Sequence, residues 1–266
     1  WFALFAVFCV LLPPVSAVGQ SQITWYRYDL PPYHILRGEF AGEGPLDYIY
    51  SQEKQWLSEY EHVAVNVNVK RMAREYSSRK DYRCITSSFI FPVSVPNWIW
   101  SKALYVEPPA VVVANDKVIA QHAEDRSVDF SELLKNKSLK FGHFEGRIYA
   151  GVVDPLINTY IDKPHVVSVS SYASGESLMR MLSRGRVDFI VEYLPEIHWL
   201  MLSGQLDTDI RLTSLRIKGH DPLSPVHIGC VNTAWGKKTI ERVDKQITHE
   251  VRESIWQKYE KWLHTD

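Results

Sequence analysis

The chain has 266 residues, with 30 Lys and Arg against 31 Asp and Glu, a formal net charge of −1, and 45% hydrophobic residues. This composition is typical of an ordinary globular protein, and the length allows one large or two medium domains. No basic run or stripe is present, which excludes the usual electrostatic footprint of a nucleic-acid-binding protein. We therefore expect no nucleic acid partner.

The chain begins with an apolar segment that resembles a secretory signal. Trp1–Leu12 carries no charge and is too short to span a bilayer, and Val15-Ser16-Ala17 supplies small residues at the cleavage positions. The initiator Met and the positive region are absent, so we expect residues 1–17 to be a signal peptide clipped at its N-terminus. The alternative is a buried N-terminal helix or strand. The favoured interpretation predicts a periplasmic or extracellular protein.

Cys9 lies within the expected signal peptide, so Cys84 and Cys230 are the cysteines expected in the mature chain. An even number of cysteines in an oxidising compartment is compatible with a single disulfide. Two buried free thiols are the alternative.

Hydrophobic periodicity predicts a β-α-β-α-β order in the first half of the chain. Pro45 suits the first position of a helix, and strictly alternating valines indicate a half-buried strand. In order, we predict a strand over 23–28, a helix from Pro45, a strand over 63–70, a helix over 71–76 and a strand at 84–85. Such alternation calls for a mainly parallel sheet with right-handed crossovers.

After an irregular segment over 91–105, the second half repeats the α/β alternation and then ends in helices. In order, we predict a strand over 111–114, a helix over 130–134, a strand over 139–142, a helix within 149–161, and strands over 166–169, 212–217 and 226–231. The C-terminal segment has a wide apolar helical face.

The unit from Ser177 to Tyr193 organises this second half. A helix is followed by Gly185, which suits a C-cap with positive φ, and then by an apolar run typical of a strand buried on both faces. Glu192 and Tyr193 come just past that strand, and Pro195 is expected to end it. Open α/β sheets bind ligands beyond the carboxyl ends of their strands, so these two side chains are candidate ligand contacts.

Several pieces of the chain, in their order and spacing, resemble the type II periplasmic solute-binding proteins. The likeness is closest to the family-3 extracellular solute-binding proteins for polar amino acids. The pieces are Ile23-Thr24-Trp25 with Pro31-Pro32-Tyr33, Val111 to Asn115, Gly142-His143-Phe144-Glu145-Gly146, Gly185-Arg186-Val187-Asp188, and the tail from Ile228-Gly229-Cys230 to Tyr259-Glu260-Lys261-Trp262.

The resemblance implies a two-lobed α/β fold with mainly parallel sheets and a hinge between the lobes. Lobe 1 would comprise residues 18–110 and 227–266, and lobe 2 residues 111–226. A small ligand would bind between the lobes and drive closure. The protein would act as a monomer without a cofactor, and it would present its ligand to an ABC transporter permease or a membrane sensor.

The chain departs from the family at the residues that hold an amino acid. In the family an arginine clamps the ligand's α-carboxylate, and here Ser94 of Phe91-Pro92-Val93-Ser94 stands in its place. The family's amine-binding aspartate falls near Tyr193. Because Ser cannot replace a bidentate Arg–carboxylate pair, we expect free polar amino acids to bind weakly or not at all.

Candidate ligand contacts lie at predicted strand ends, at turns and among the aromatic residues. Arg147, at a strand-to-helix turn after Gly146, is a candidate for holding an anion, and its alternative is a solvated surface arginine. The aromatic candidates, with Trp100 among them, could equally pack in the core. The predicted ligand-binding residues are Asp29, Tyr33, Ser87, Ser88, Ser94, Trp98, Arg147, Tyr149, Glu192 and Tyr193.

Signals for catalysis are weak. Ser51 and Lys54 match a Ser-x-x-Lys motif without its companion motifs, and the histidines show no pair at metal-ligand helical spacing. We therefore predict a binding protein with no catalytic residue and no metal. The alternative is an enzyme on the same scaffold, of the small-acid dehydratase type, with Glu192 and His34 as candidate acid or base groups. Asp188 is expected to bond neighbouring backbone.

Overall fold

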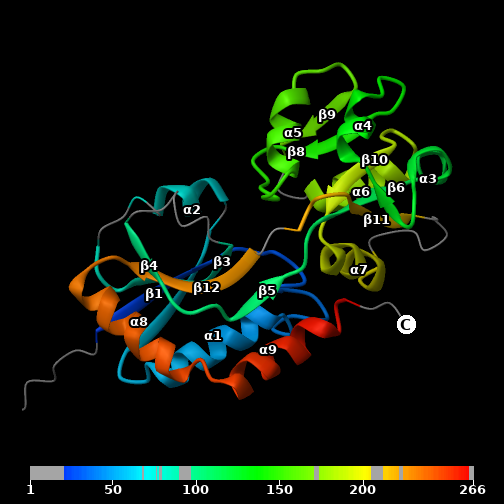
Figure 1. Ribbon diagram of the computed structural model, residues 1–266. Coiled ribbons are helices and arrows are strands. Elements are labelled where there is room, and N and C mark those ends of the chain that lie inside the picture. The colour runs from blue at the N-terminus through cyan, green and yellow to red at the C-terminus, as the bar shows by residue number, and fades with distance from the viewer. Residues whose placement is uncertain are drawn as a thin grey trace, which may run out of the picture.

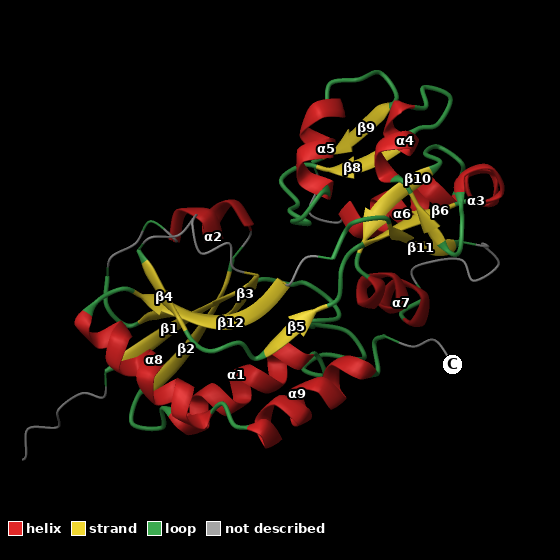
Figure 2. Ribbon diagram, viewed as in Figure 1, coloured by secondary structure: helices red, strands yellow, loops and turns green. Residues whose placement is uncertain are grey.

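The protein folds into two lobes, each built on a six-stranded sheet (Figure 1). The structure is a computed structural model that describes residues 21–67, 69–75, 77, 80–89, 97–170, 174–204, 212–221 and 224–263. Helices pack against both sheets, as Figure 2 shows. The two-lobed α/β fold expected from the sequence is confirmed.

Lobe 1 contains the strand order β2-β1-β3-β12-β4, with β5 also paired to β12. Helices α1, α8 and α9 lie on one side of this sheet and α2 lies on the other (Figure 2). Its elements are β1 (Gln22–Arg27), α1 (Pro45–Trp56), β2 (Glu61–Asn66), α2 (Val69–Glu75), β3 (Arg83–Phe89), β4 (Trp98–Trp100), β5 (Tyr105–Glu107), β12 (Ser224–Val231), α8 (Ala234–Gln246) and α9 (His249–Glu260).

Lobe 2 contains the strand order β7-β11-β6-β10-β8-β9. Its elements are β6 (Val111–Ala114), α3 (Asp116–His122), β7 (Ser127–Val128), α4 (Phe130–Lys135), β8 (Phe141–Phe144), α5 (Val153–Tyr160), β9 (Val166–Val169), α6 (Ser174–Ser183), β10 (Phe189–Glu192), α7 (Leu194–Leu202) and β11 (Thr213–Ile217). The chain passes between the two sheets after Glu107 and again after Ile217.

Both sheets are mixed rather than mainly parallel. Strands within each βα run are parallel, as in the pairs β1–β2, β1–β3, β8–β9 and β8–β10. The strands that follow the crossings between lobes run the other way: β12 is antiparallel to β3, β4 and β5, and β6 is antiparallel to β10 and β11. The expectation of mainly parallel sheets therefore holds only within the βα runs.

The largest local differences from the sequence predictions concern one strand end and two helices. The strand predicted over 63–70 ends at Asn66, and α2 begins at Val69. Helices α3 and α7 were not predicted. Pro195, expected to end a strand, instead lies in the first turn of α7, where its missing N–H leaves no intrahelical bond unmade.

An aromatic contact joins the lobes on the side of the C-terminus. Trp262, just after α9, packs edge-on against Trp199 of α7 at a ring separation of 5.4 Å, and Phe40 contacts both rings. The Trp262 carbonyl also lies 3.1 Å from Nδ1 of His198. Figure 1 shows α7 (yellow) beside the C-terminal end of α9 (red). The two sheets are thus linked by side-chain packing as well as by the two chain crossings.

Cys84 and Cys230 form a disulfide between β3 and β12. The two residues are register partners in the antiparallel pair, and both are fully buried in the lobe 1 core. The bond closes a loop with a sequence separation of 146 residues that contains all of lobe 2. Of the two alternatives that the sequence left open, the structure shows the disulfide, and it joins the early and late parts of the lobe 1 sheet.

Replacing both cysteines, as Cys84→Ala/Cys230→Ala, should lower the free energy of unfolding by about 2–5 kcal/mol, because the unfolded chain regains the entropy of a long loop. Urea denaturation of the variant and of wild type measures the difference. A reducing agent should bring wild type to the variant's midpoint and leave the variant unchanged. Equal midpoints without reductant would contradict the expectation.

Candidate functional site

Polar side chains converge at the carboxyl ends of the neighbouring parallel strands β8 and β10. The turn after β8 carries Arg147, and β10 ends at Glu192, followed directly by Tyr193. Tyr193 is also the N-cap of α7, so the first turn of that helix brings Glu196 to the same place. Three segments of lobe 2 therefore supply one cluster.

The Arg147 guanidinium is held by two carboxylates of this cluster. Its Nη1 donates to Glu196 Oε2 at 2.9 Å, and its Nη2 lies 2.8 Å from Glu192 Oε1 and also donates to Glu196 Oε1. The guanidinium carbon lies 5.6 Å from the centre of the Tyr149 ring and 5.2 Å from that of Tyr193. Only 15% of the Arg147 side chain is exposed. Both carboxylates and both aromatic rings thus stabilise one largely buried cation.

Hydrogen bonds fix the turn that presents Arg147. Asp154, at the start of α5, accepts from the backbone N–H of Tyr149 at 2.9 Å and of Ala150 at 2.8 Å. The Tyr149 hydroxyl donates to the Val191 carbonyl of β10 at 2.9 Å, which ties the turn to the next strand. Gly146 adopts φ 81°, a conformation that favours glycine.

Lobe 1 places a third carboxylate at the boundary between the lobes. Glu107, the last residue of β5, is fully buried, and its Oε1 accepts from the Tyr33 hydroxyl at 2.7 Å and from the Tyr259 hydroxyl of α9. Among the described residues, Glu107 Oε2 has no hydrogen-bond partner. Gly44 allows the loop that carries Tyr33 to lie against α1, because a Cβ there would be 2.1 Å from the Tyr33 carbonyl oxygen.

The two groups of carboxylates act on each other across the boundary. Burial raises the pKa of Glu107 to about 8, the Tyr259 and Tyr33 hydroxyls and the Arg147 guanidinium oppose this shift, and the negative charge of Glu196 adds to it. Burial likewise raises the pKa of Glu192 to about 8, with Arg147 opposing and Glu196 adding. Two carboxylates thus contact one guanidinium, and a third, that of Glu107, acts on it at longer range. Burial together with this surplus of acid favours proton uptake.

Five of the predicted ligand contacts belong to this boundary cluster. Arg147, Tyr149, Glu192 and Tyr193 lie together in lobe 2, and Tyr33 joins through Glu107. All except Arg147 are buried. Their role in ligand binding stays a prediction.

The other predicted contacts lie elsewhere. Asp29 accepts from the Leu36 N–H at 3.3 Å and pairs with Arg37 at 3.0 Å, so it stabilises its own loop. Trp98 is buried and stacks on Trp100 at 6.1 Å in the core of lobe 1, as the alternative interpretation of the aromatic residues supposed. Ser87 and Ser88 lie on β3, whereas Ser94 is outside the described residues.

Three residues of the cluster, Glu107, Glu196 and Tyr259, were not predicted from the sequence. Glu196 follows Pro195 as an acidic residue in a first helical turn, a pattern that marks helix starts. Glu107 is the single charge in the stretch 103–114, which a search for isolated charges would have found. Nothing in the sequence around Tyr259 distinguishes it from core aromatics.

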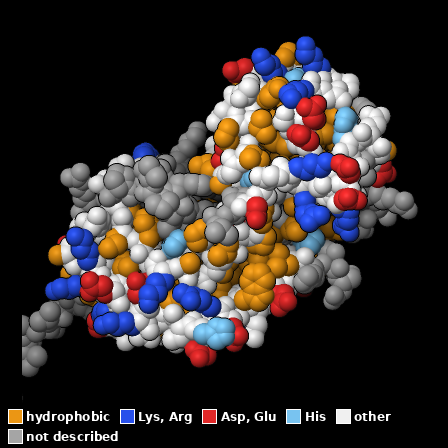
Figure 3. Space-filling model, viewed as in Figure 1, with side chains coloured by type: hydrophobic (Ala, Val, Ile, Leu, Met, Phe, Trp, Pro, Cys, Tyr) orange, Lys and Arg blue, Asp and Glu red, His pale blue; other side chains and the backbone are white. Residues whose placement is uncertain are grey.

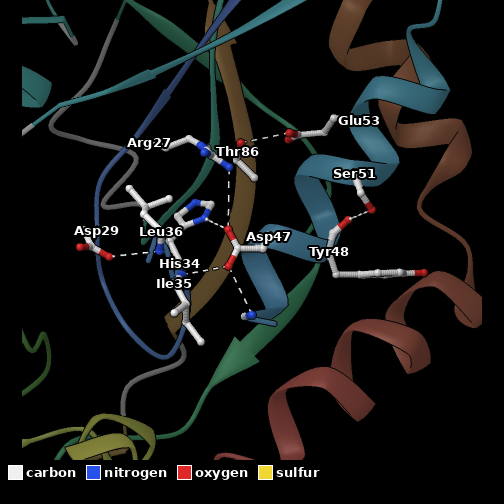
Figure 4. Close-up of polar contacts among 11 residues, drawn as sticks. Arg27, Asp29, His34, Ile35, Leu36, Asp47, Tyr48, Ser51, Glu53 and Thr86 are labelled. Atoms are coloured by element: carbon white, nitrogen blue, oxygen red, sulfur yellow. Dashed lines mark hydrogen bonds and ion pairs between the residues drawn. The ribbon is translucent and has the colours of Figure 1, made fainter. Parts of the chain in front are cut away.

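A second polar cluster, shown in Figure 4, ties the loop after β1 to helix α1. Asp47 accepts from the N–H of Ile35 at 2.8 Å and of Gly44 at 3.3 Å, and its Oδ1 lies 3.2 Å from His34 Nδ1 and 3.8 Å from Arg27 Nη1. Burial lowers the pKa of His34, and Asp47 opposes this shift. This cluster positions the loop that carries Tyr33.

Asp188 bonds neighbouring backbone, as predicted: its Oδ2 accepts from the Lys140 N–H at 2.8 Å. Within the described part of the chain, no three His, Cys, Asp or Glu side chains gather so as to hold a metal ion. No helix in that same part is long and apolar enough to cross a bilayer.

Comparisons with known proteins give the fold. No family model matches the chain, and no curated protein matches its sequence. Solved structures do match: a Bordetella pertussis BvgS VFT2 domain (double mutant) superposes with a TM-score of 0.60 at 13% identity, covering 91% of this chain and 93% of that one. An ancestral cationic amino acid solute-binding protein gives 0.62 at 11% identity, covering 92% and 96%.

A third structure is an amino acid ABC transporter substrate-binding protein, AbpA, from Streptococcus pneumoniae, bound to L-arginine. It gives a TM-score of 0.59 at 13% identity and covers 92% of this chain and 97% of that one. The chain therefore has the two-lobed fold of periplasmic solute-binding proteins, and the resemblance expected from the sequence is confirmed at the level of the fold.

Glu107→Gln should flatten the dependence of stability on pH. Because folding raises the Glu107 pKa from 4.5 to about 8, the native state holds a proton that the unfolded state releases. The stabilisation that this proton gives the folded state is complete below the unfolded pKa and is lost as the pH rises to about 8. Over that range the free energy of unfolding falls by up to about 1.4 kcal/mol per pH unit. Urea denaturation between pH 5 and 8 should show a smaller decline for the variant than for wild type.

Glu132→Gln is the matched control, because Glu132 is an exposed residue of α4 that pairs with Lys135. This control should keep the wild-type decline. The same decline in Glu107→Gln as in wild type would show that Glu107 does not hold the proton.

Proposed function

We propose that the protein is an exported solute-binding protein that captures a small polar or aromatic-compatible ligand between two lobes, residues 18–110 with 227–266 and residues 111–226. The observation that carries the proposal is the meeting of Arg147, Glu192 and Tyr193, at strand ends of lobe 2, with Glu107 of lobe 1. In open α/β sheets this edge is where ligands bind.

The architecture supports a hinge mechanism. The chain crosses between the sheets after Glu107 and after Ile217, and hinges of this kind absorb rotation in a few residues at the ends of elements. Figure 3 shows hydrophobic side chains (orange) gathered where the two lobes meet. A ligand that contacts Glu107 on one lobe and Glu192 on the other would favour the closed arrangement.

Structural neighbours support delivery to a transporter. AbpA is described as an amino acid ABC transporter substrate-binding protein, and by analogy the ligand-loaded protein would dock on an ABC permease. A membrane sensor is the second candidate partner. In either case the protein acts as a monomer in the periplasm or outside the cell, after cleavage near Ala17.

An enzyme of the small-acid dehydratase type is the competing function. Its candidate acid and base groups, His34 and Glu192, belong to different clusters: His34 contacts Asp47 in lobe 1, and Glu192 pairs with Arg147 in lobe 2. Each side chain is engaged in holding its own lobe together. This arrangement favours binding over catalysis.

Binding of the proper ligand should close the lobes. We expect native mass spectrometry of protein purified without denaturation, followed by a thermal-shift screen of amino acids, peptides, sugars, amines and organic acids, to identify a ligand. Small-angle scattering at saturating ligand should then show a smaller radius of gyration. An unchanged radius with the bound ligand would contradict closure.

Free glutamine, histidine and arginine should fail to bind at micromolar affinity, which corresponds to about −8 kcal/mol, because Ser94 replaces the family's clamp arginine. Isothermal calorimetry measures this directly. Micromolar binding of any of these amino acids would show that another group holds the α-carboxylate.

A further inference from the structure

We propose that Arg147 is a built-in occupant of a cation site in lobe 2, and that the solute of this protein is an organic cation without a carboxylate, which takes the site by displacing the Arg147 guanidinium. The inference rests on the proposed solute-binding function and names the chemical class of its ligand. Agmatine and putrescine are representative probes.

The surroundings of Arg147 are those that a cationic ligand requires. Two carboxylates, Glu192 and Glu196, bind its guanidinium, and the rings of Tyr149 and Tyr193 lie against it. Carboxylates combined with aromatic faces are the usual means of recognising organic cations. These four residues form the cation site, and a side chain of the protein fills it.

The charge around the site also selects a cation. Glu107 adds a third carboxylate from lobe 1, and its fully buried Oε2 has no hydrogen-bond partner among the described residues. A buried acceptor left unpaired is costly unless a donor arrives or a proton binds. A ligand with two cationic or donor groups could contact both the lobe 2 carboxylates and the unpaired Oε2 of Glu107, whereas a ligand carboxylate would face the two carboxylates that hold Arg147.

Arg147 is the member of the cluster best able to move. Glu192 lies on β10 in the middle of the lobe 2 sheet, and Glu196 lies in α7, which packs through Trp199 against lobe 1. The turn that carries Arg147 is fixed, but the long Arg147 side chain is itself 15% exposed and its neighbour Ile148 is 54% exposed, so the side chain can rotate toward solvent. Displacement would move Arg147 into solvent and leave both carboxylates in place.

The test is the sign of the effect of Arg147→Ala on agmatine binding, measured by isothermal calorimetry at fixed pH and salt. Removing a competing occupant should strengthen binding by about ten- to a hundred-fold, the equivalent of one charge-assisted contact. If Arg147 instead holds an anionic group of the ligand, the same substitution should weaken binding by a similar factor. Arg180→Ala is the matched control, because Arg180 is an exposed residue of α6 that pairs with Glu176, and it should bind as wild type does.

Arg147→Met keeps the bulk of the side chain without its charge and should strengthen binding in the same way if the alanine variant folds poorly. The inference is overturned if agmatine and putrescine bind to either folded variant no more tightly than they bind to wild type. If the solute screen yields only anions or zwitterions, and scattering shows closure with them, the cation inference fails while the proposed function stands. If no solute of any class binds, the proposed function fails as well.

Discussion

Three carboxylates and one guanidinium are buried together where the lobes meet, and the structure around them compensates for that burial. Arg147 neutralises part of the charge of Glu192 and Glu196, and two tyrosine hydroxyls donate to Glu107. Removing a charge from water costs free energy, and only well-placed ion pairs and hydrogen bonds offset that cost. Without these partners the burial of the charges would destabilise the protein. Burial is the main cause of the raised pKa of Glu107 and of Glu192, and the negative charge of Glu196 adds to it.

Helix α7 links this polar cluster to the apolar contact between the lobes. Its first turn directs Glu196 to Arg147, and three residues later Trp199 packs against Trp262. Residues three apart lie on neighbouring parts of a helix surface, so one short rigid element carries both contacts. A movement of lobe 2 that changes the packing at Trp262 would therefore also change the position of Glu196 relative to Glu107 of lobe 1.

Periodic and local signals predicted most of the α/β elements, the resemblance to solute-binding proteins predicted the two lobes, and long-range burial decided the rest. The helix, glycine and strand over 177–193 were predicted because each step has a local cause, and Gly185 indeed adopts φ 63°. The two cysteines left for an oxidising compartment allowed either a disulfide or two free thiols, and only their register partnership across β3 and β12 in the structure decides for the bond. Helix α7 was missed because a proline after a strand can either end it or start a helix. Glu107 was missed because its partners Tyr33 and Tyr259 lie 74 and 152 residues away in the sequence.

The same reasoning bears on why such a cluster persists at a lobe boundary. Replacing a buried ion cluster by well-packed apolar side chains often increases stability, so stability alone gives little reason to keep three acids there. In a binding protein such a cluster has a second use. Carboxylates that lack enough positive charge around them gain the most favourable interaction free energy when a cationic ligand binds. On this view the acid surplus is free energy stored in the unliganded protein and released on binding. Glu107 on one lobe and Glu192 on the other would then share a single ligand, and that sharing would hold the lobes together.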